Sequence, residues 1–235
     1  MNLSRLPGWE KSRPVLRILI PFLLMPLLVL ASGAFLAERG YAWGILAMVL
    51  LTQALFFTGF EKRTVGSRRL VIAAVLTALS VSGRFIFALL PGFKPITAIV
   101  VISAVWLGSE TGFLVGSLSA LISNLFISQG PWTPFQMFAW GMIGLLAGYL
   151  AVPLRRSRIC LALYGVLAGV AYSLFMDVWT VLWYNNGIQW ELYTAAVVTA
   201  LPYTVSYAVS NVIFLLLLGR PLGKKLERVR IRYGI

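Results

Sequence analysis

Two charged side chains, Arg84 and Asp177, lie inside long apolar stretches of this sequence. A charge within a bilayer costs at least about 2.5 kcal/mol, so it usually faces a partner or a cavity. Counted along the predicted helices, both residues lie about 10 Å below the same membrane surface. At equal depth they can form an ion pair that joins two helices, or they can line a ligand cavity open at that surface. The sequence leaves both interpretations open, and they are compatible if the pair forms the cavity floor.

Aromatic and carboxamide side chains gather near the same predicted surface. Tryptophan and tyrosine also form the aromatic belt at a membrane interface, which is the simpler interpretation. A belt needs no amides, so the mixture favours a pocket for a flat, polar molecule that contains rings. The candidate substrate-binding residues are Arg84, Phe93, Lys94, Gln129, Trp132, Gln136, Asp177, Trp179, Trp183, Tyr184, Asn185, Asn186 and Trp190.

Several kinds of chemistry are excluded by what the sequence lacks. It has no histidine, a single cysteine and only seven acidic residues. It has no GxxxxGK[ST] phosphate-binding loop and no HExxH motif. The carboxylates are too few for a metal-dependent phosphotransferase. The sequence therefore predicts a protein that is not an enzyme, with no catalytic residue, no metal site and no cofactor of its own.

The elements that must position these residues are apolar helices. Hydrophobic residues make up 60% of the chain and charged residues 11%, whereas soluble domains carry about 25% charged residues. A bilayer core about 30 Å thick needs about 20 apolar residues per helix. The sequence predicts an all-α integral membrane protein of about eight transmembrane helices. The predicted spans are 15–37, 41–60, 70–90, 96–107, 111–128, 135–152, 159–184 and 194–218, with a break at 108–110.

The basic residues are divided unequally between the two sides of these spans. With the N-terminus inside, 17 of the 20 lysines and arginines fall on the inner side, and Arg39 and Lys94 fall on the outer side. Cytoplasmic loops carry such an excess of positive charge. The distribution predicts a plasma-membrane protein with both termini in the cytoplasm. It also argues against a nucleic-acid partner, because the charges form short clusters beside lipid rather than one soluble face.

Small residues recur at every fourth position of several predicted helices. Such stripes let two helix backbones approach closely. For the glycine stripes we expect internal packing: Gly108, Gly112 and Gly116; Gly144 and Gly148; Gly165 and Gly169. The pair Ala74 and Ala78 lies one turn inside the cytoplasmic end of its helix. It has two interpretations, internal packing or a docking face for a partner membrane protein.

From Leu70 onward the sequence resembles the substrate-binding S component of an energy-coupling factor (ECF) transporter. The AxxxA motif of that family reads Ala74-Val75-Leu76-Thr77-Ala78 here. Two further segments are similar, Gly112–Gly116 and Gly130–Met137. The resemblance implies a six-helix core over 70–218. The two-helix extension over 1–69 departs from the six-helix plan of the family, and its role is open. A basic cytoplasmic tail over 219–235 follows the core.

The resemblance also implies partners and a ligand site. Ala74 and Ala78 would dock on a transmembrane scaffold (T) subunit, and two partner ATPase subunits would use ATP. The ligand would lie under the loops 91–95, 129–134 and 185–193, near the outer surface. The distribution of aromatic and amide residues, taken without the resemblance, points to the same three loops as the ligand site.

The predicted function is therefore that of a membrane receptor subunit of an ABC importer that binds a vitamin or related micronutrient. Cobalamin is favoured as the ligand, with a queuosine precursor or another vitamin left open. Two alternatives come from other classes. A stand-alone secondary carrier would show repeated halves and a coupling carboxylate near the midplane. A structural or regulatory membrane protein would bind no vitamin.

Overall fold

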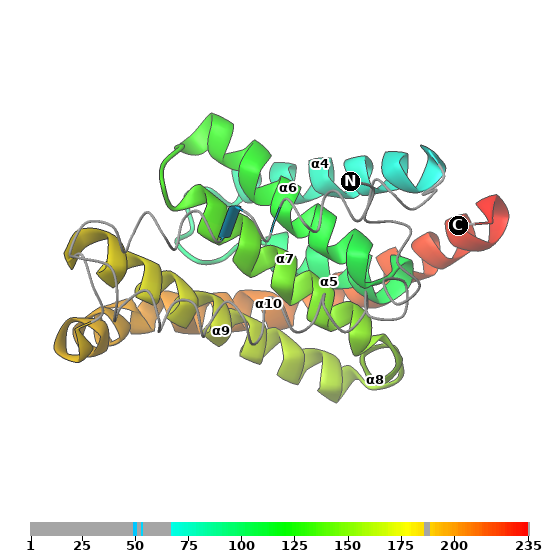
Figure 1. Cartoon of the computed structure of the whole chain (residues 1–235). Coiled ribbons are helices and arrows are strands. Elements are labelled where there is room, and N and C mark those ends of the chain that lie inside the picture. The colour runs from blue at the N-terminus through cyan, green and yellow to red at the C-terminus, as the bar shows by residue number, and fades with distance from the viewer. Residues whose placement is uncertain (1–48, 51–52, 54–66, 186–188, 235) are drawn as a thin grey trace, which may run out of the picture.

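The computed structural model describes residues 49–50, 53, 67–185 and 189–234 (Figure 1). The first two predicted spans therefore lie outside the described residues, apart from three positions. Seven helices form in the described part. They are α4 (Ser67–Ile86), α5 (Ile96–Leu107), α6 (Ser109–Ile127), α7 (Thr133–Tyr149), α8 (Ala151–Arg156), α9 (Arg158–Asn185) and α10 (Trp190–Tyr233).

Six of these helices correspond to the predicted six-helix core. Four of them, α4, α6, α9 and α10, are long and apolar enough to cross a membrane. The other two are shorter, with 12 residues in α5 and 17 in α7. The helical, apolar architecture of a multi-pass membrane protein is thus confirmed. The count of eight spans and the cytoplasmic placement of both termini stay predictions.

Helix α5 is the centre of the bundle, because α4, α6, α7 and α10 all pack against it. Every residue of α5 except Trp106 is buried. A helix that is apolar on all sides is stable only when neighbours cover all of its surface. In Figure 1, α6 and α7 lie together, and α9 and α10 form a second pair.

The glycine stripes form the contacts between paired helices, as predicted. A Cβ on Gly112 would come within 2.9 Å of the Gly144 carbonyl oxygen. On the second pair, a Cβ on Gly169 would come within 2.7 Å of the Ala208 backbone nitrogen. Both contacts are with backbone atoms, which cannot turn aside as a side chain can. The absence of side chains at these positions is what lets α6 approach α7 and α9 approach α10.

The predicted break at 108–110 is present but is a single residue, Gly108, because Ser109 and Glu110 already belong to α6. Gly108 has a φ of +100°, which only glycine adopts without strain, and it separates α5 from α6. Its N–H donates to the Ala104 carbonyl at 2.8 Å, so the end of α5 is closed by a backbone hydrogen bond. The 12-residue α5 and the 19-residue α6 therefore replace one longer helix at this point.

Three boundaries differ from the predictions. The helix predicted to reach residue 90 ends at Ile86, because tighter turns follow in which Ala88 N–H donates to Phe85 O at 3.0 Å. The segment 153–158, predicted as a basic loop, is mostly the short helix α8. Helix α10 begins at Trp190 and continues through the predicted basic tail to Tyr233, a total of 44 residues.

Candidate functional site

The connections after α4 and α6 and the end of α9 lie at one end of the bundle, on the left in Figure 1. We call this the aromatic end and define it by residues 84–95, 123–136 and 175–184. Most of the predicted substrate-binding residues belong to it. The opposite end, formed by residues 67–69, 105–110, 151–161 and 216–233, is the basic end.

The connection after α4 is fixed against α10 by hydroxyl groups. Ser206 Oγ donates to the Pro91 carbonyl at 2.8 Å. The Lys94 N–H donates to Ser210 Oγ at 2.8 Å, and that hydroxyl donates to the Lys94 carbonyl at 3.0 Å. Two residues one turn apart on α10 therefore hold Pro91 and Lys94, in the second half of the connection 87–95.

Arg84 is the buried cation of the aromatic end. It lies in the last turn of α4, and only 9% of its surface is exposed. One guanidinium nitrogen, Nη1, donates to Asn124 Oδ1 at 2.7 Å and also to Ser123 Oγ. The guanidinium carbon lies 5.4 Å from the centre of the Trp140 ring, an arrangement in which a cation is attracted to the aromatic face. These neutral partners stabilise the charge without cancelling it.

A chain of amides and a hydroxyl extends from Arg84 toward the surface. Asn124 Nδ2 donates to Thr133 Oγ1 and to Gln136 Oε1, each at 2.9 Å. Thr133 Oγ1 in turn donates to Gln129 Oε1 at 2.8 Å. The chain joins the end of α6 to the start of α7. Two of the predicted amides, Gln129 and Gln136, thus belong to one network with the predicted arginine.

Arg84 and Asp177 do not form an ion pair. The guanidinium faces α6 and Trp140 instead, as its hydrogen bonds show. Asp177 is 9% exposed, and its Oδ2 atom is buried without a hydrogen-bond partner. Of the two interpretations of these charges, the interhelical ion pair is therefore wrong. A buried carboxylate oxygen without a partner is unfavourable unless water or a ligand reaches it.

Trp179 is the centre of the aromatic cluster at this end. Its ring lies 6.0 Å from Trp132 in an edge-to-face arrangement and 6.3 Å from Trp183 in a stacked one. Phe135 and Tyr184 are 6.1 and 6.3 Å away. The indole N–H of Trp179 is buried and has no hydrogen-bond partner. Four of the predicted aromatic residues are thus brought together on α7 and α9.

Other predicted residues lie apart from this cluster. Phe93 packs with Phe87 and Phe214, at ring distances of 5.8 and 5.2 Å, against the middle of α10. Trp190 contacts Tyr193 at the exposed beginning of α10. Asn186 and the side chain of Asn185 lie outside the described residues, so their part in binding stays a prediction.

Lys94 places a second positive charge near Arg84. Burial lowers the pKa of the Lys94 ammonium, and the nearby Arg84 charge lowers it further. The two positive charges create a positive potential at the end of α4. This potential favours a ligand that presents carbonyl or hydroxyl oxygens there.

Sequence reasoning missed the residues that support Arg84. Asn124 and Trp140 contact it, and Tyr172 stacks on Trp140 with ring centres 4.7 Å apart. Tyr207 meets Tyr172 edge to face at 5.2 Å. The available signal was the pair Ser123-Asn124 in an apolar helix, since polar residues there need partners.

The segment before α4 also reaches this end. Gln53 Nε2 donates to the Pro134 carbonyl at 2.8 Å, and Val49 is buried in the cluster that contains Phe135 and Trp179. At these two positions the N-terminal extension contacts the start of α7. The sequence left the role of the extension open.

Comparison with protein families decides the class. The model of the family described as "ECF-type riboflavin transporter, S component" matches residues 65–228. The chain belongs to this family. No curated protein and no solved structure matches it. The matched region contains the whole six-helix core, and the resemblance to an ECF S component is confirmed at the level of the family. The match does not support the cobalamin-specific type.

As an ECF S component, the chain is a membrane transport protein rather than a member of an enzyme class. S components bind vitamin-type ligands and work with T and ATPase modules. The predicted docking pair, Ala74 and Ala78, is exposed on α4. Large apolar side chains flank it, with Val71 and Val75 each 62% exposed. The described residues leave this face of α4 uncovered.

Proposed function

We propose that this S component binds its vitamin at the aromatic end, beside Arg84, and delivers it to the cytoplasm with a T subunit and two ATPase subunits. The observation that carries the proposal is the state of Arg84. It is a buried cation at the end of α4 with hydroxyl, amide and aromatic partners but no carboxylate among the described residues. A charge retained in this form is costly, and membrane proteins keep such charges mainly for function.

Three buried polar atoms of the aromatic end lack hydrogen-bond partners among the described residues. Arg84 Nε and Trp179 Nε1 are donors without partners, and Asp177 Oδ2 is an acceptor without one. Buried polar atoms are nearly always paired, so each of these needs water or a ligand. Arg84 Nε and Trp179 Nε1 can each donate to a ligand, and Asp177 Oδ2 can accept from one.

Riboflavin is the ligand we propose first. The matching family is named for it, and its flat, fused rings carry carbonyl oxygens that suit buried donors. Its rings can pack against the aromatic cluster around Trp179, whereas its hydroxylated chain can meet the amides of Gln129 and Gln136. Cobalamin, which the sequence favoured, is the second candidate, because its amide-rich rim could use the same groups.

The decisive experiment is a binding panel on the full-length protein, purified in nanodiscs. Equilibrium dialysis against radiolabelled riboflavin, cobalamin and other vitamins should give saturable binding of riboflavin at one ligand per chain. Saturable binding of another vitamin would replace riboflavin but keep the site. A chain that binds no vitamin would indicate the structural or regulatory alternative and overturn the proposal.

Docking through Ala74 and Ala78 is the second part of the proposal. Replacing both alanines with tryptophan should abolish co-purification with the T and ATPase subunits and ATP-dependent uptake, because bulky side chains prevent close helix contact. Vitamin binding should be unchanged. The matched control replaces Leu163 and Leu167, which are exposed and four residues apart on α9, with tryptophan. Retained uptake in the alanine variant, or uptake driven by a proton gradient in vesicles without ATPases, would contradict this part.

A further inference from the structure

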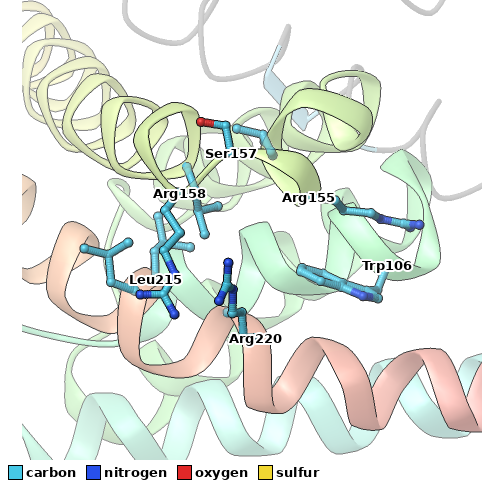
Figure 2. Close-up of a pocket in the computed structure, with 10 residues that line it drawn as sticks. Trp106, Arg155, Ser157, Arg158, Leu215 and Arg220 are labelled. Atoms are coloured by element: carbon cyan, nitrogen blue, oxygen red, sulfur yellow. The ribbon is translucent and has the colours of Figure 1, made fainter.

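A small hollow at the basic end is lined by three arginines and has no acidic residue in its lining. It has a volume of about 40 Å³ and lies where the α8–α9 junction meets α10. Figure 2 shows Arg158 and Arg220 reaching into it from α9 and α10. A space of about 10–15 Å³ on this measure holds one water, so the hollow has room for about one phosphate group.

The third arginine is held in place at the edge of the hollow. Arg155 Nε donates to the Val105 carbonyl at 2.9 Å, and its guanidinium carbon lies 5.5 Å from the centre of the Trp106 ring. Burial and the nearby Arg230 charge lower the pKa of Arg155, while Glu227 opposes that effect. The effect of Arg230 on Arg155 exceeds that of Glu227, so positive charge predominates around Arg155. An added anion would be stabilised there.

The side chains around the three arginines are mostly apolar. Leu161, Leu215 and Leu216 complete its wall. Exposed apolar side chains continue from it along the outer faces of α9 and α10, including Ile159 and Leu217. A polar, cationic hollow that opens onto an apolar helix surface matches a molecule with an anionic head and hydrocarbon tails.

We propose that this hollow binds the phosphodiester of an anionic phospholipid, with Arg158 and Arg220 as the main ligands and Arg155 at its edge. Basic hollows between membrane helices on the cytoplasmic side bind anionic lipid headgroups. Arginine suits phosphate because its planar group donates two parallel hydrogen bonds. The acyl chains would lie along α9 and α10. The site faces the cytoplasmic leaflet in the orientation that the positive charges predict.

The test compares lipids retained by the full chain. The protein is reconstituted in nanodiscs of phosphatidylcholine with a minority of phosphatidylglycerol, an anionic lipid of the kind that attracts basic segments. Bound lipids are then counted by native mass spectrometry. We expect enrichment of phosphatidylglycerol in the wild type and a drop on the order of tenfold in the double variant R158Q/R220Q, since each basic group contributes severalfold. No enrichment in the wild type would overturn the proposal.

Two matched variants control for charge and for folding. K224Q/K225Q removes the same charge from exposed positions on α10 outside the hollow, and should keep the enrichment. R158K/R220K keeps the charge and should retain most of the phosphatidylglycerol enrichment. That result would show that R158Q/R220Q loses lipid because the site is changed and not because the protein misfolds. An equal drop of phosphatidylglycerol enrichment in K224Q/K225Q would mean that general surface charge attracts the lipid, and would contradict a specific site in the hollow.

Two further outcomes separate the sources of the anion. Thermal stability is measured in nanodiscs of phosphatidylcholine alone, with and without inorganic phosphate. Stabilisation by phosphate equal to that by phosphatidylglycerol would assign the site to a soluble anion and overturn the lipid. Unchanged lipid retention in R158Q/R220Q, together with lost co-purification of the T and ATPase subunits, would assign the hollow to a partner protein.

Discussion

The aromatic end and the basic end of this bundle differ in how far their positive charges are buried. At the aromatic end Arg84 is buried and donates to side chains of α6. At the basic end Arg158 and Arg220 line an open hollow beside exposed helix surfaces. A buried charge pays a large desolvation cost, whereas a charge at the surface pays little.

This difference indicates which end discriminates between ligands. Polar groups in a dry, preformed site reject molecules that leave them unpaired, so recognition is sharp. Charges at the membrane boundary attract any suitable anion by a field that salt screens. The aromatic end is therefore expected to select one vitamin, whereas the basic end selects a class of lipid.

The largest expected effect comes from removing the buried charge. Arg84→Met should weaken riboflavin binding on the order of 100-fold, because hydrogen bonds to a charged group contribute about 1.5–3 kcal/mol. Equilibrium dialysis measures the change. Arg220→Met, the same substitution at the basic end, should leave the affinity within about twofold, since that charge is distant from the vitamin.

Arg84→Lys separates charge from geometry. It should recover part of the affinity but not all of it, because lysine lacks the planar arrangement of donors. Wild-type affinity in Arg84→Met, or an equal loss in Arg220→Met, would break the contrast between the two ends.

A substitution in the middle of the bundle should lower the stability of the whole protein and so affect both ends together. Gly112→Val would place side-chain atoms against the Gly144 backbone and should lower the free energy of unfolding by about 2 kcal/mol, as overpacking does. Thermal unfolding of the detergent-solubilised protein measures this. Ala195→Val, at an exposed position of α10, is the control and should have little effect. A stable Gly112→Val variant would mean that α6 and α7 are not in such close contact.

The smallest effect should come from one N–H group. Trp179→Phe keeps an aromatic ring but removes the buried indole donor that has no partner. Vitamin affinity should fall by about fivefold, the value of one neutral hydrogen bond, while thermal stability changes little. Trp106→Phe at the basic end should leave vitamin affinity unaltered. A stability loss in Trp179→Phe without a change in affinity would show that the donor serves the fold.

The general architecture was predictable because its signals are local. Gly108, a turn former beside a polar pair, predicted the break that separates α5 from α6. The glycine stripes predicted which helix faces touch, since spacing along one helix places them on one side. The end of α4 was not predictable in the same way, because the turns after Ile86 depend on the tie between Pro91 and α10.

The site was predictable in its residue types but not in its pairings. Arg84, Gln129, Gln136 and Trp179 were identified because charges, amides and indoles near one surface need an explanation. The equal depth of Arg84 and Asp177 suggested a pair, but depth says nothing about the direction in which a side chain points. The direction depends on Asn124 and Trp140, which come from other helices, and on contacts that no local pattern encodes.

The length of α10 limits how the whole molecule can move in a bilayer. Its 44 residues extend roughly 66 Å, about twice the hydrocarbon thickness. The part that exceeds this thickness carries Lys224, Lys225 and Arg228, and Arg68 donates to its last turn through Tyr233 O at 3.2 Å. Dragging these cations into hydrocarbon would cost about 2.5–3.5 kcal/mol each. The charged C-terminal part of α10 therefore permits rotations of the protein that keep these cations in water and opposes rotations that would move them into the hydrocarbon core.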